Sequence, residues 1–427
     1  MWHSASSRNL QQRKVGVTVS IAVGGLSDIS AQGPSSKERA SIDRTDAAMD
    51  LQAIARFARD AFLPTVTAHI FIASSLAFIS PHATSIRIAA SVVTAALCFE
   101  AIRRCNKRTS EESSYADYMF GLAFHTNCYL VLLNLSPPSD LTTTWQRLQW
   151  GTNTLFSPRM GTKPYRRDPP STTKREFLMR RITTAIAIGT FWLYIREGLR
   201  FYPRDLGPED WDSRKTYMTP GILNGTLTLR DLWFRVVLAF YAYSGSALTI
   251  CGAHTVCALI AVGIFDSPLQ DWPPLFGNIT QAYTLRRWYS HFWHKAMRKA
   301  FTIHAVVVTE KGLGLRKHTI PGRSVIVLLS FFFSGVMHSV TSWHSGPCSD
   351  HFAPVRSFML FGIFILLEQA VMSAYLEVYR RLRIPWTGLE LVFWRLFGHC
   401  WVVFFLLEFT ITSAYTNIQC VWSLDEV

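Results

Sequence analysis

Two histidines are the residues of this chain whose type and spacing suit proton transfer. His338 lies inside a membrane-length apolar segment, and His294 follows a tryptophan in a basic, aromatic stretch 44 residues earlier. An imidazole with an ordinary pKa of about 6.5 can accept or donate a proton at neutral pH. Because an ionisable side chain is costly in hydrocarbon, a histidine within a membrane span indicates a functional site.

The neighbours of His338 on its own helix face are small or carry hydroxyl groups. Residues three and four positions away share a helix face, and here they are Ser334, Gly335, Thr341 and Ser342. Small side chains permit close approach of another helix or leave room for a substrate chain. A general base needs such space and a hydroxyl within about 3 Å. The alternative for His338 is a hydrogen bond to a neighbouring helix without catalysis.

The stretch around His294 has an apolar and a basic stripe. The apolar stripe recurs at helical spacing and consists of Leu285, Trp288, Tyr289, Phe292, Trp293, Ala296 and Ala300. The opposite stripe consists of Arg287, His291, His294, Lys295 and Arg298. This pattern predicts a basic amphipathic helix at the membrane interface. Its cations suit either lipid headgroups or an anionic co-substrate.

Composition places these residues in a membrane protein. Only 17% of the 427 residues are charged and 49% are hydrophobic, whereas soluble domains carry about 25% charged residues. The net charge of +14 comes from cations beside apolar segments, which is typical of loops that orient membrane helices. We therefore expect no nucleic-acid partner. The eight cysteines show no CxxC pair or zinc spacing, so neither a structural metal nor a disulfide framework is expected.

The sequence predicts an all-α, polytopic integral membrane protein with about eight transmembrane helices. A span needs about 20 mostly apolar residues, and eight segments qualify: 62–80, 83–102, 118–136, 178–197, 231–265, 324–343, 355–376 and 391–412. The fifth is long enough for a tilted helix or for a break around Gly252. Residues 51–415 then form one membrane domain. A polar, disordered segment is expected over 1–50 and a short tail over 416–427.

Loop charges suggest an orientation. Loops 137–177, 266–323 and 377–390 are basic, and loop 344–354 has no Lys or Arg. Placing basic loops in the cytosol makes the chain alternate from residue 137 onward. The cations between 103 and 108 would then be lumenal, which leaves the first two spans open.

Further ionisable residues lie inside apolar segments. The main ones are Glu368, Arg395 and His399, of which the last two share a helix face. They could line a substrate path, but a buried polar contact between helices is favoured.

Two motifs resemble those of the membrane-bound O-acyltransferase superfamily, and more narrowly its fungal wax-synthase-like branch. The first is Trp293-His294, followed in the next span by Ser334-Gly-Val-Met-His338. The second is Trp272-Pro-Pro-Leu-Phe-Gly277 ahead of the Trp-His stretch. The register of that stretch is kept, with Trp288-Tyr289 where the branch has Phe-Trp. The resemblance covers roughly residues 60–410.

The resemblance implies an acyl-CoA-dependent O-acyltransferase with an intramembrane catalytic tunnel. His338 would be the catalytic base and His294 the second active-site residue. Within the fungal branch it implies acetyl transfer from acetyl-CoA to a hydroxyl of an apolar terpenoid or meroterpenoid secondary metabolite, in the endoplasmic reticulum membrane. Acetyl-CoA would be a co-substrate, with no tightly bound cofactor. The alternatives are a long-chain wax-ester or sterol-ester synthase and, from another class, a transporter or lipid-binding membrane protein.

The chemistry required of these residues is modest. A thioester is already activated, so His338 need only deprotonate an alcohol while His294 stabilises or orients the carbonyl. The sequence has no serine nucleophile elbow, which favours direct transfer. Coenzyme A carries phosphates, and the residues expected to bind it are Trp293, Arg287, Lys295 and Arg298.

Overall fold

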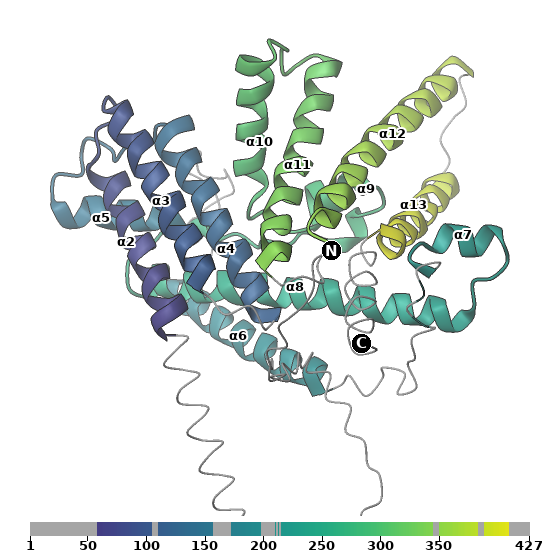
Figure 1. Cartoon of the computed structure of the whole chain (residues 1–427), viewed down its shortest axis with the longest axis horizontal. Coiled ribbons are helices and arrows are strands. Elements are labelled where there is room, and N and C mark those ends of the chain that lie inside the picture. The colour runs from purple at the N-terminus through teal and green to yellow at the C-terminus, as the bar shows by residue number, and fades with distance from the viewer. Residues whose placement is uncertain are drawn as a thin grey trace, which may run out of the picture.

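The computed structural model describes residues 58–104, 110–156, 172–197, 210, 212, 215–344, 350–382 and 388–409. Every regular element in these ranges is helical (Figure 1). Five helices are long and apolar enough to cross a membrane: α3 (Thr84–Arg104), α8 (Leu229–Gly263), α11 (Ile320–His344), α12 (Ala353–Leu382) and α13 (Gly388–Phe409). The all-α membrane fold is thereby confirmed. The predicted segments 1–50 and 416–427 lie outside the described residues.

The other three predicted spans are also helical, but they are shorter or more polar. They are α2 (Leu63–Phe78), α4 (Ser110–Asn127), which continues as a π-helical turn over Cys128–Leu132, and α6 (Lys174–Glu197). The long α8 has no break at Gly252. It begins with a capping box, because Thr228 and Asp231 each bond the backbone N–H of the other.

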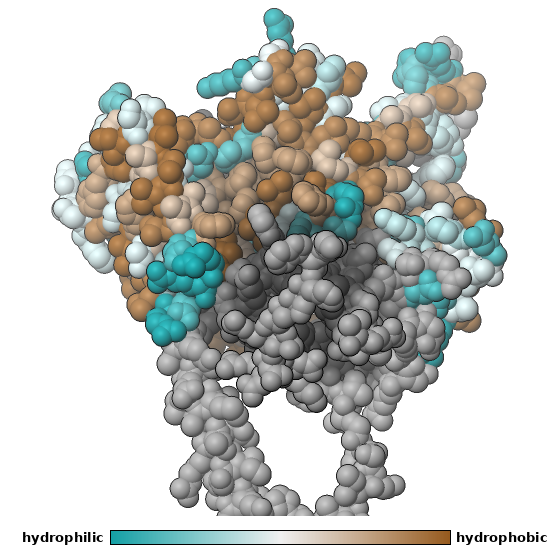
Figure 2. Space-filling model, in the orientation of Figure 1, coloured by the Kyte–Doolittle hydropathy of each residue, from teal (hydrophilic) through white to brown (hydrophobic). Residues whose placement is uncertain are grey.

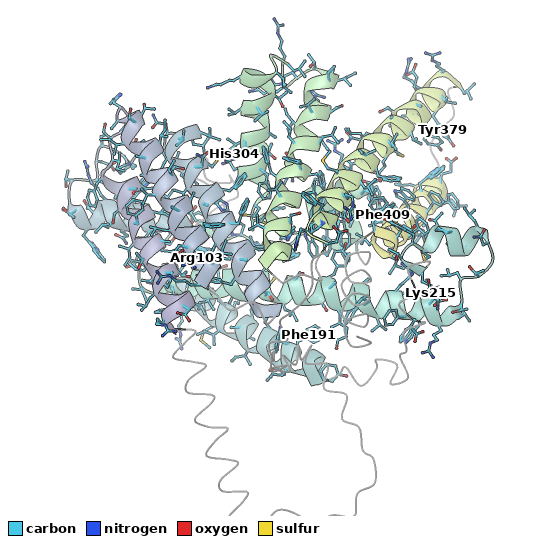
Figure 3. The ribbon with its side chains drawn as sticks, viewed as in Figure 1. Arg103, Phe191, Lys215, His304, Tyr379 and Phe409 are labelled. Atoms are coloured by element: carbon cyan, nitrogen blue, oxygen red, sulfur yellow. The ribbon has the colours of Figure 1, made fainter. Side chains whose placement is uncertain are left out.

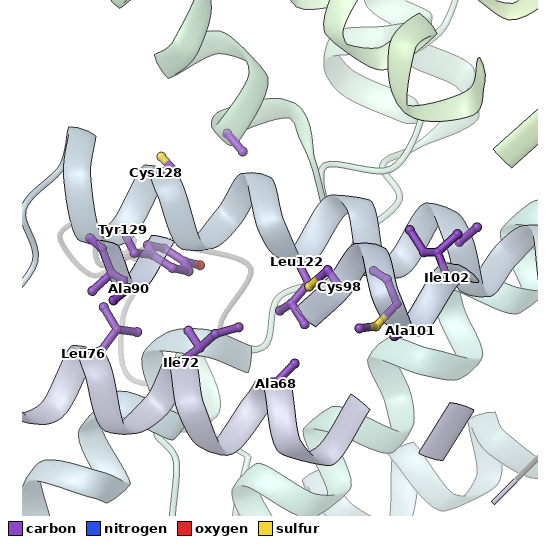
Figure 4. Packing of buried hydrophobic residues seen from close by; sticks show 14 residues of the cluster. Ala68, Ile72, Leu76, Ala90, Cys98, Ala101, Ile102, Leu122, Cys128 and Tyr129 are labelled. Atoms are coloured by element: carbon purple, nitrogen blue, oxygen red, sulfur yellow. The ribbon is translucent and has the colours of Figure 1, made fainter. Parts of the chain in front are cut away.

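The N-terminal helices α2, α3 and α4 pack together with α5 (Thr144–Phe156) against α2. Their shared core is apolar, and Figure 4 shows Ile72 and Leu76 of α2 turned toward residues of α3 and α4. The buried Arg87 donates to the carbonyls of Ile79, Ser80 and Leu130. Those carbonyls lie at helix ends, where intrahelical partners are missing.

Helix α11 lies between α4 and α12, and α10 (Arg298–Val307) packs beside it. The approach of α11 to α12 is close at Gly335, where a Cβ would lie 2.8 Å from the Cα of Val355. Of the two roles that the sequence left open for the small residues around His338, Gly335 therefore serves close helix approach. On the side of α10 that faces α4, Figure 3 shows His304, whose ring centroid is 4.8 Å from that of Phe124 on α4.

Helix α8 runs across the ends of these helices in Figure 1, with α6, α5 and α13 packed on it. The short α7 (Met218–Leu223) precedes it, and single turns occur at Ala58–Phe62, Leu269–Asp271, Ile279–Gln281 and Val308–Gly312. Figure 2 shows a largely hydrophobic surface over the transmembrane helices, with hydrophilic residues at their tips. Exposed apolar side chains of α3, α12 and α13 contribute to the apolar surface of the protein, as expected of helices that face lipid.

The predicted continuous amphipathic helix over residues 285–300 is wrong. Helix α9 (Leu285–Arg287) runs into the π-helical turn η8 (Trp288–Phe292), the backbone is extended at Trp293, and α10 begins only at Arg298. The break arises because this stretch bonds to the preceding motif. The Gly277 N–H donates to the Phe292 carbonyl (2.9 Å), and the Lys295 N–H donates to the Leu275 carbonyl (3.2 Å).

Gly277 explains the last position of the Trp-Pro-Pro-Leu-Phe-Gly motif. A Cβ at Gly277 would lie only 1.8 Å from the carbonyl oxygen of His291, so no other residue fits without moving the backbone. The motif begins at Trp272, which is 2% exposed and donates its indole N–H to the Ser267 hydroxyl. The motif is therefore a rigid support for the segment that carries His294.

Candidate active site

His338 is paired with a carboxylate from a distant part of the chain. Its Nδ1 lies 2.9 Å from Oδ2 of Asp117, which α4 supplies. The two side chains keep 35% and 27% of their surface accessible, so another molecule can reach the pair. A carboxylate that accepts the Nδ1–H fixes the tautomer and leaves the Nε2 lone pair available as a base.

The ring of His338 is also held on one face. Phe358 of α12 stacks on it with a centroid separation of 5.0 Å and an interplanar angle of 16°. The contact depends on Gly335, which is one turn before His338 and lets α12 approach. Three helices thus determine how this imidazole is presented.

His294 lies close enough to His338 and Asp117 for both to shift its pKa. Burial and, second to it, the neighbouring His338 together lower the pKa of His294 to about 4, although Asp117 acts in the opposite direction. His294 is therefore neutral at physiological pH. Its buried Nδ1 has no hydrogen-bond partner among the residues that the structure describes, a costly state that a bound substrate oxygen would relieve. The two predicted catalytic histidines thus lie within electrostatic range of each other.

Trp293 packs inside an aromatic cluster. Its ring centroid lies 5.1 Å from that of Tyr243, 5.4 Å from that of Phe276 and 5.9 Å from that of Trp288. It also contacts the ring of His294 at 5.4 Å. Trp293 therefore orients the peptide that leads to His294.

Two of the three predicted phosphate-binding cations already bond to the protein. Arg287 donates to Oε1 of Gln281 (3.0 Å) and lies 4.5 Å above the ring of Tyr283. Arg298 donates to the Ser290 carbonyl (2.6 Å). Both arginines retain further N–H donors for a ligand.

The cations nevertheless form one basic cluster beside the active site. The pKa of the exposed His291 is lowered by partial desolvation and then by Arg287, Arg298, Lys295 and Arg286. All four cations therefore lie within electrostatic range of this one imidazole. Lys295 is exposed and only one residue from His294.

Sequence reasoning missed Asp117. The available signal was an acidic residue beside the apolar run that begins at Tyr118, because ionisable groups near membrane spans call for a partner. Its partner is 221 residues away, and no local pattern encodes that pairing. The signal was therefore present, but the residue it points to could not be inferred from it.

Comparison with known families identifies one match. Residues 272–363 match the model of the Membrane bound O-acyl transferase family. The matched segment includes Trp272, both histidines and Phe358, whereas Asp117 lies outside it.

Curated relatives are fungal acetyltransferases. Acetyltransferase aurG of Calcarisporium arbuscula is 28% identical over 283 residues, which are 64% of this chain and 65% of that protein. Acetyltransferase eriL of Hericium erinaceus is 27% identical over 290 residues, 62% of this chain and 69% of that protein. Acetyltransferase nanB of Aspergillus nanangensis is 31% identical over 166 residues, 39% of each chain. The chain thus spans about two thirds of the length of the first two relatives. No solved structure matches.

Proposed function

We propose that this chain, whose residues 272–363 match the model of the Membrane bound O-acyl transferase family, transfers an acyl group from acyl-CoA to a hydroxyl of an apolar acceptor. The observation that carries the proposal is the 2.9 Å contact between His338 Nδ1 and Asp117, next to the neutral His294. A histidine oriented by a carboxylate is suited to take a proton from an alcohol.

In the proposed reaction, His338 Nε2 takes the proton of the acceptor hydroxyl as its oxygen attacks the thioester carbonyl. Asp117 stabilises the imidazolium that forms, as the acid of a catalytic triad does. The neutral His294 donates a hydrogen bond to the developing oxyanion. The carbon–sulfur bond then breaks, the coenzyme A sulfur takes the proton back from His338, and the ester leaves.

We propose acetyl-CoA as the donor and a hydroxylated terpenoid or meroterpenoid as the acceptor. The names of the relatives, which are acetyltransferases, favour the short acyl group over a long-chain wax or sterol ester. The basic cluster around His291 offers cations to the coenzyme A phosphates. One catalytic domain over residues 51–415 and a place in the endoplasmic reticulum membrane complete the proposal.

The test is acyl transfer by membranes that contain the protein, with donors from acetyl- to palmitoyl-CoA and a panel of hydroxylated terpenoids. Products are identified by mass spectrometry. His338→Ala should lower turnover at least about 100-fold. The matched control is His82→Ala, which removes an exposed imidazole outside the site. Full activity of His338→Ala would refute the base, and preference for palmitoyl-CoA would refute the acetyl donor.

A further inference from the structure

Glu368 is an acidic residue near the middle of the apolar α12, and its carboxylate bonds to the backbone of another segment. Oε2 accepts the N–H of Leu285 (2.8 Å), and Oε1 accepts the N–H of Arg286 (3.3 Å). The indole N–H of Trp401 on α13 also donates to Oε2 (3.3 Å). A carboxylate inside an apolar span needs interactions that offset the cost of removing its charge from water, and these three hydrogen-bond donors supply them.

The two backbone N–H groups have no other partner in their own helix. They belong to the first turn of α9, where N–H groups lack intrahelical acceptors. The hydroxyl of Thr284 accepts the third, from Arg287 (3.0 Å). Glu368 therefore completes the start of α9, and it lets the backbone of Leu285 lie at the middle of α12. Irregular backbone at such depth is tolerated where protein covers it.

Helix α13 contacts the same stretch from another side. Nε2 of His399 lies 3.3 Å from the carbonyl oxygen of Ile279, and the Arg395 guanidinium lies 5.6 Å from the centroid of the Tyr283 ring. A Cβ at Gly398 would lie 2.1 Å from the Tyr283 carbonyl oxygen. We name residues 279–286 the docked segment. The ionisable residues that the sequence left unassigned thus hold this segment.

The docked segment leads directly into the part of the chain that carries His294. From Arg286 the chain passes through η8 and reaches His294 eight residues later. His294 lies within electrostatic range of His338 and Asp117, which α11 and α4 supply. A displacement of the docked segment therefore moves His294 relative to His338. Misplacement by about 1 Å can cost about 100-fold in rate.

We propose that Glu368 is a positioning residue that fixes the segment carrying His294 at the depth of His338. The inference rests on the proposed acyl transfer for its catalytic consequence. Glu368 touches neither histidine in the contacts described above, so its effect passes through the backbone between residues 285 and 294.

The chain contains a matched control. Glu408 of α13 also accepts two consecutive backbone N–H groups, from Met218 (2.7 Å) and Thr219 (3.2 Å), at the start of the short α7. Its chemistry is that of Glu368, but α7 carries neither histidine. Glu408→Gln therefore reports what the loss of such a carboxylate does to the fold alone.

The experiment compares Glu368→Gln and Glu408→Gln in the full chain. Hydrogen exchange by mass spectrometry on the detergent-solubilised protein measures protection of residues 279–294, and kinetics measure kcat and KM for acetyl-CoA. We expect Glu368→Gln to speed exchange over 279–294 and to lower kcat about 10- to 100-fold. The KM for acetyl-CoA should change less than about threefold, because only alignment is lost. Glu408→Gln should leave both the exchange of 279–294 and kcat within about twofold.

Unchanged exchange over 279–294 in Glu368→Gln overturns the proposal, and so does faster exchange with unchanged kcat. Equal losses of kcat in the two variants also overturn it. If Glu368→Gln does not fold, Glu368→Asp, which keeps the charge and shortens its reach, is subject to the same criteria. Failure of the proposed function is visible separately as unchanged transfer by His338→Ala, and exchange then decides alone whether Glu368 holds the segment.

Discussion

The tautomer of His338 depends on a single carboxylate. Asp117 accepts the Nδ1–H, so Asp117→Asn should present an amide N–H in its place and favour the wrong tautomer. We expect kcat to fall at least about 100-fold while the amount of folded protein is unchanged. Steady-state kinetics with acetyl-CoA and a fluorescence size-exclusion profile measure both quantities. A kcat within about twofold of the parent value would remove Asp117 from the mechanism.

His294 acts as a neutral group, so a neutral amide should replace it partly. His294→Asn is expected to retain at least about tenfold more turnover than His294→Ala, because an amide N–H can still meet an oxyanion. Kinetics of the two variants side by side measure the difference. Equal turnover of the two variants would show that His294 contributes only bulk.

The low pKa of His294 also predicts that the folded protein loses stability in mild acid. The pKa is about 4 in the folded protein and about 6.5 when unfolded, so the unfolded state binds more protons between these values. Stability should therefore fall as pH drops from about 6.5 toward 4. His294→Asn removes this contribution, and its melting temperature should depend less on pH in that window. Identical pH profiles for parent and variant would contradict the assigned pKa.

The close contact between α11 and α12 orients the ring of His338. A Cβ at Gly335 would press on the backbone of Val355, so Gly335→Ala should separate the helices and pull Phe358 from the His338 ring. We expect a loss of about 1–3 kcal/mol in stability and a lower kcat. Gly189→Ala on α6 is the control, since its Cβ would meet no atom within 4 Å. Thermal melts that rank the two variants equally would refute this account.

The local pattern of apolar residues predicted the helices well, but it did not predict the tertiary contacts that break and connect them. Each of the eight predicted spans corresponds to a helix, because apolar length is encoded locally. The break at Trp293 was missed because it follows from backbone bonds to Leu275 and Gly277, which are tertiary contacts. Gly335 indicated either close helix approach or room for a substrate, and the structure shows close approach there. Asp117 and the role of Glu368 depend on partners far along the chain.

Across the whole molecule, several charged residues inside apolar helices bond to the backbone at the ends of other elements. Arg87 and Arg235 donate to carbonyls, while Glu368 and Glu408 accept N–H groups. Unpaired backbone groups are expensive away from water, and these side chains satisfy them.

At Arg235 this arrangement should affect stability and not catalysis. Arg235→Met should leave the carbonyl of Leu407 without its donor and destabilise the protein by about 2–4 kcal/mol. The rate per folded molecule should be unchanged, because Arg235 of α8 donates to the carbonyls of Lys215 and Leu407, which belong to neither histidine segment. Melting temperature and active fraction measure the two effects. A lower kcat per folded molecule would place Arg235 in the path to the active site.

The way His338 is held bears on regioselectivity. Asp117 occupies one nitrogen and Phe358 covers one face of the ring, so only Nε2 can receive a hydroxyl, along a single in-plane direction. An acceptor with several hydroxyl groups must then bind in one pose to react. We expect a terpenoid diol to yield one monoester and no mixture of positional isomers, which chromatography of the products would reveal.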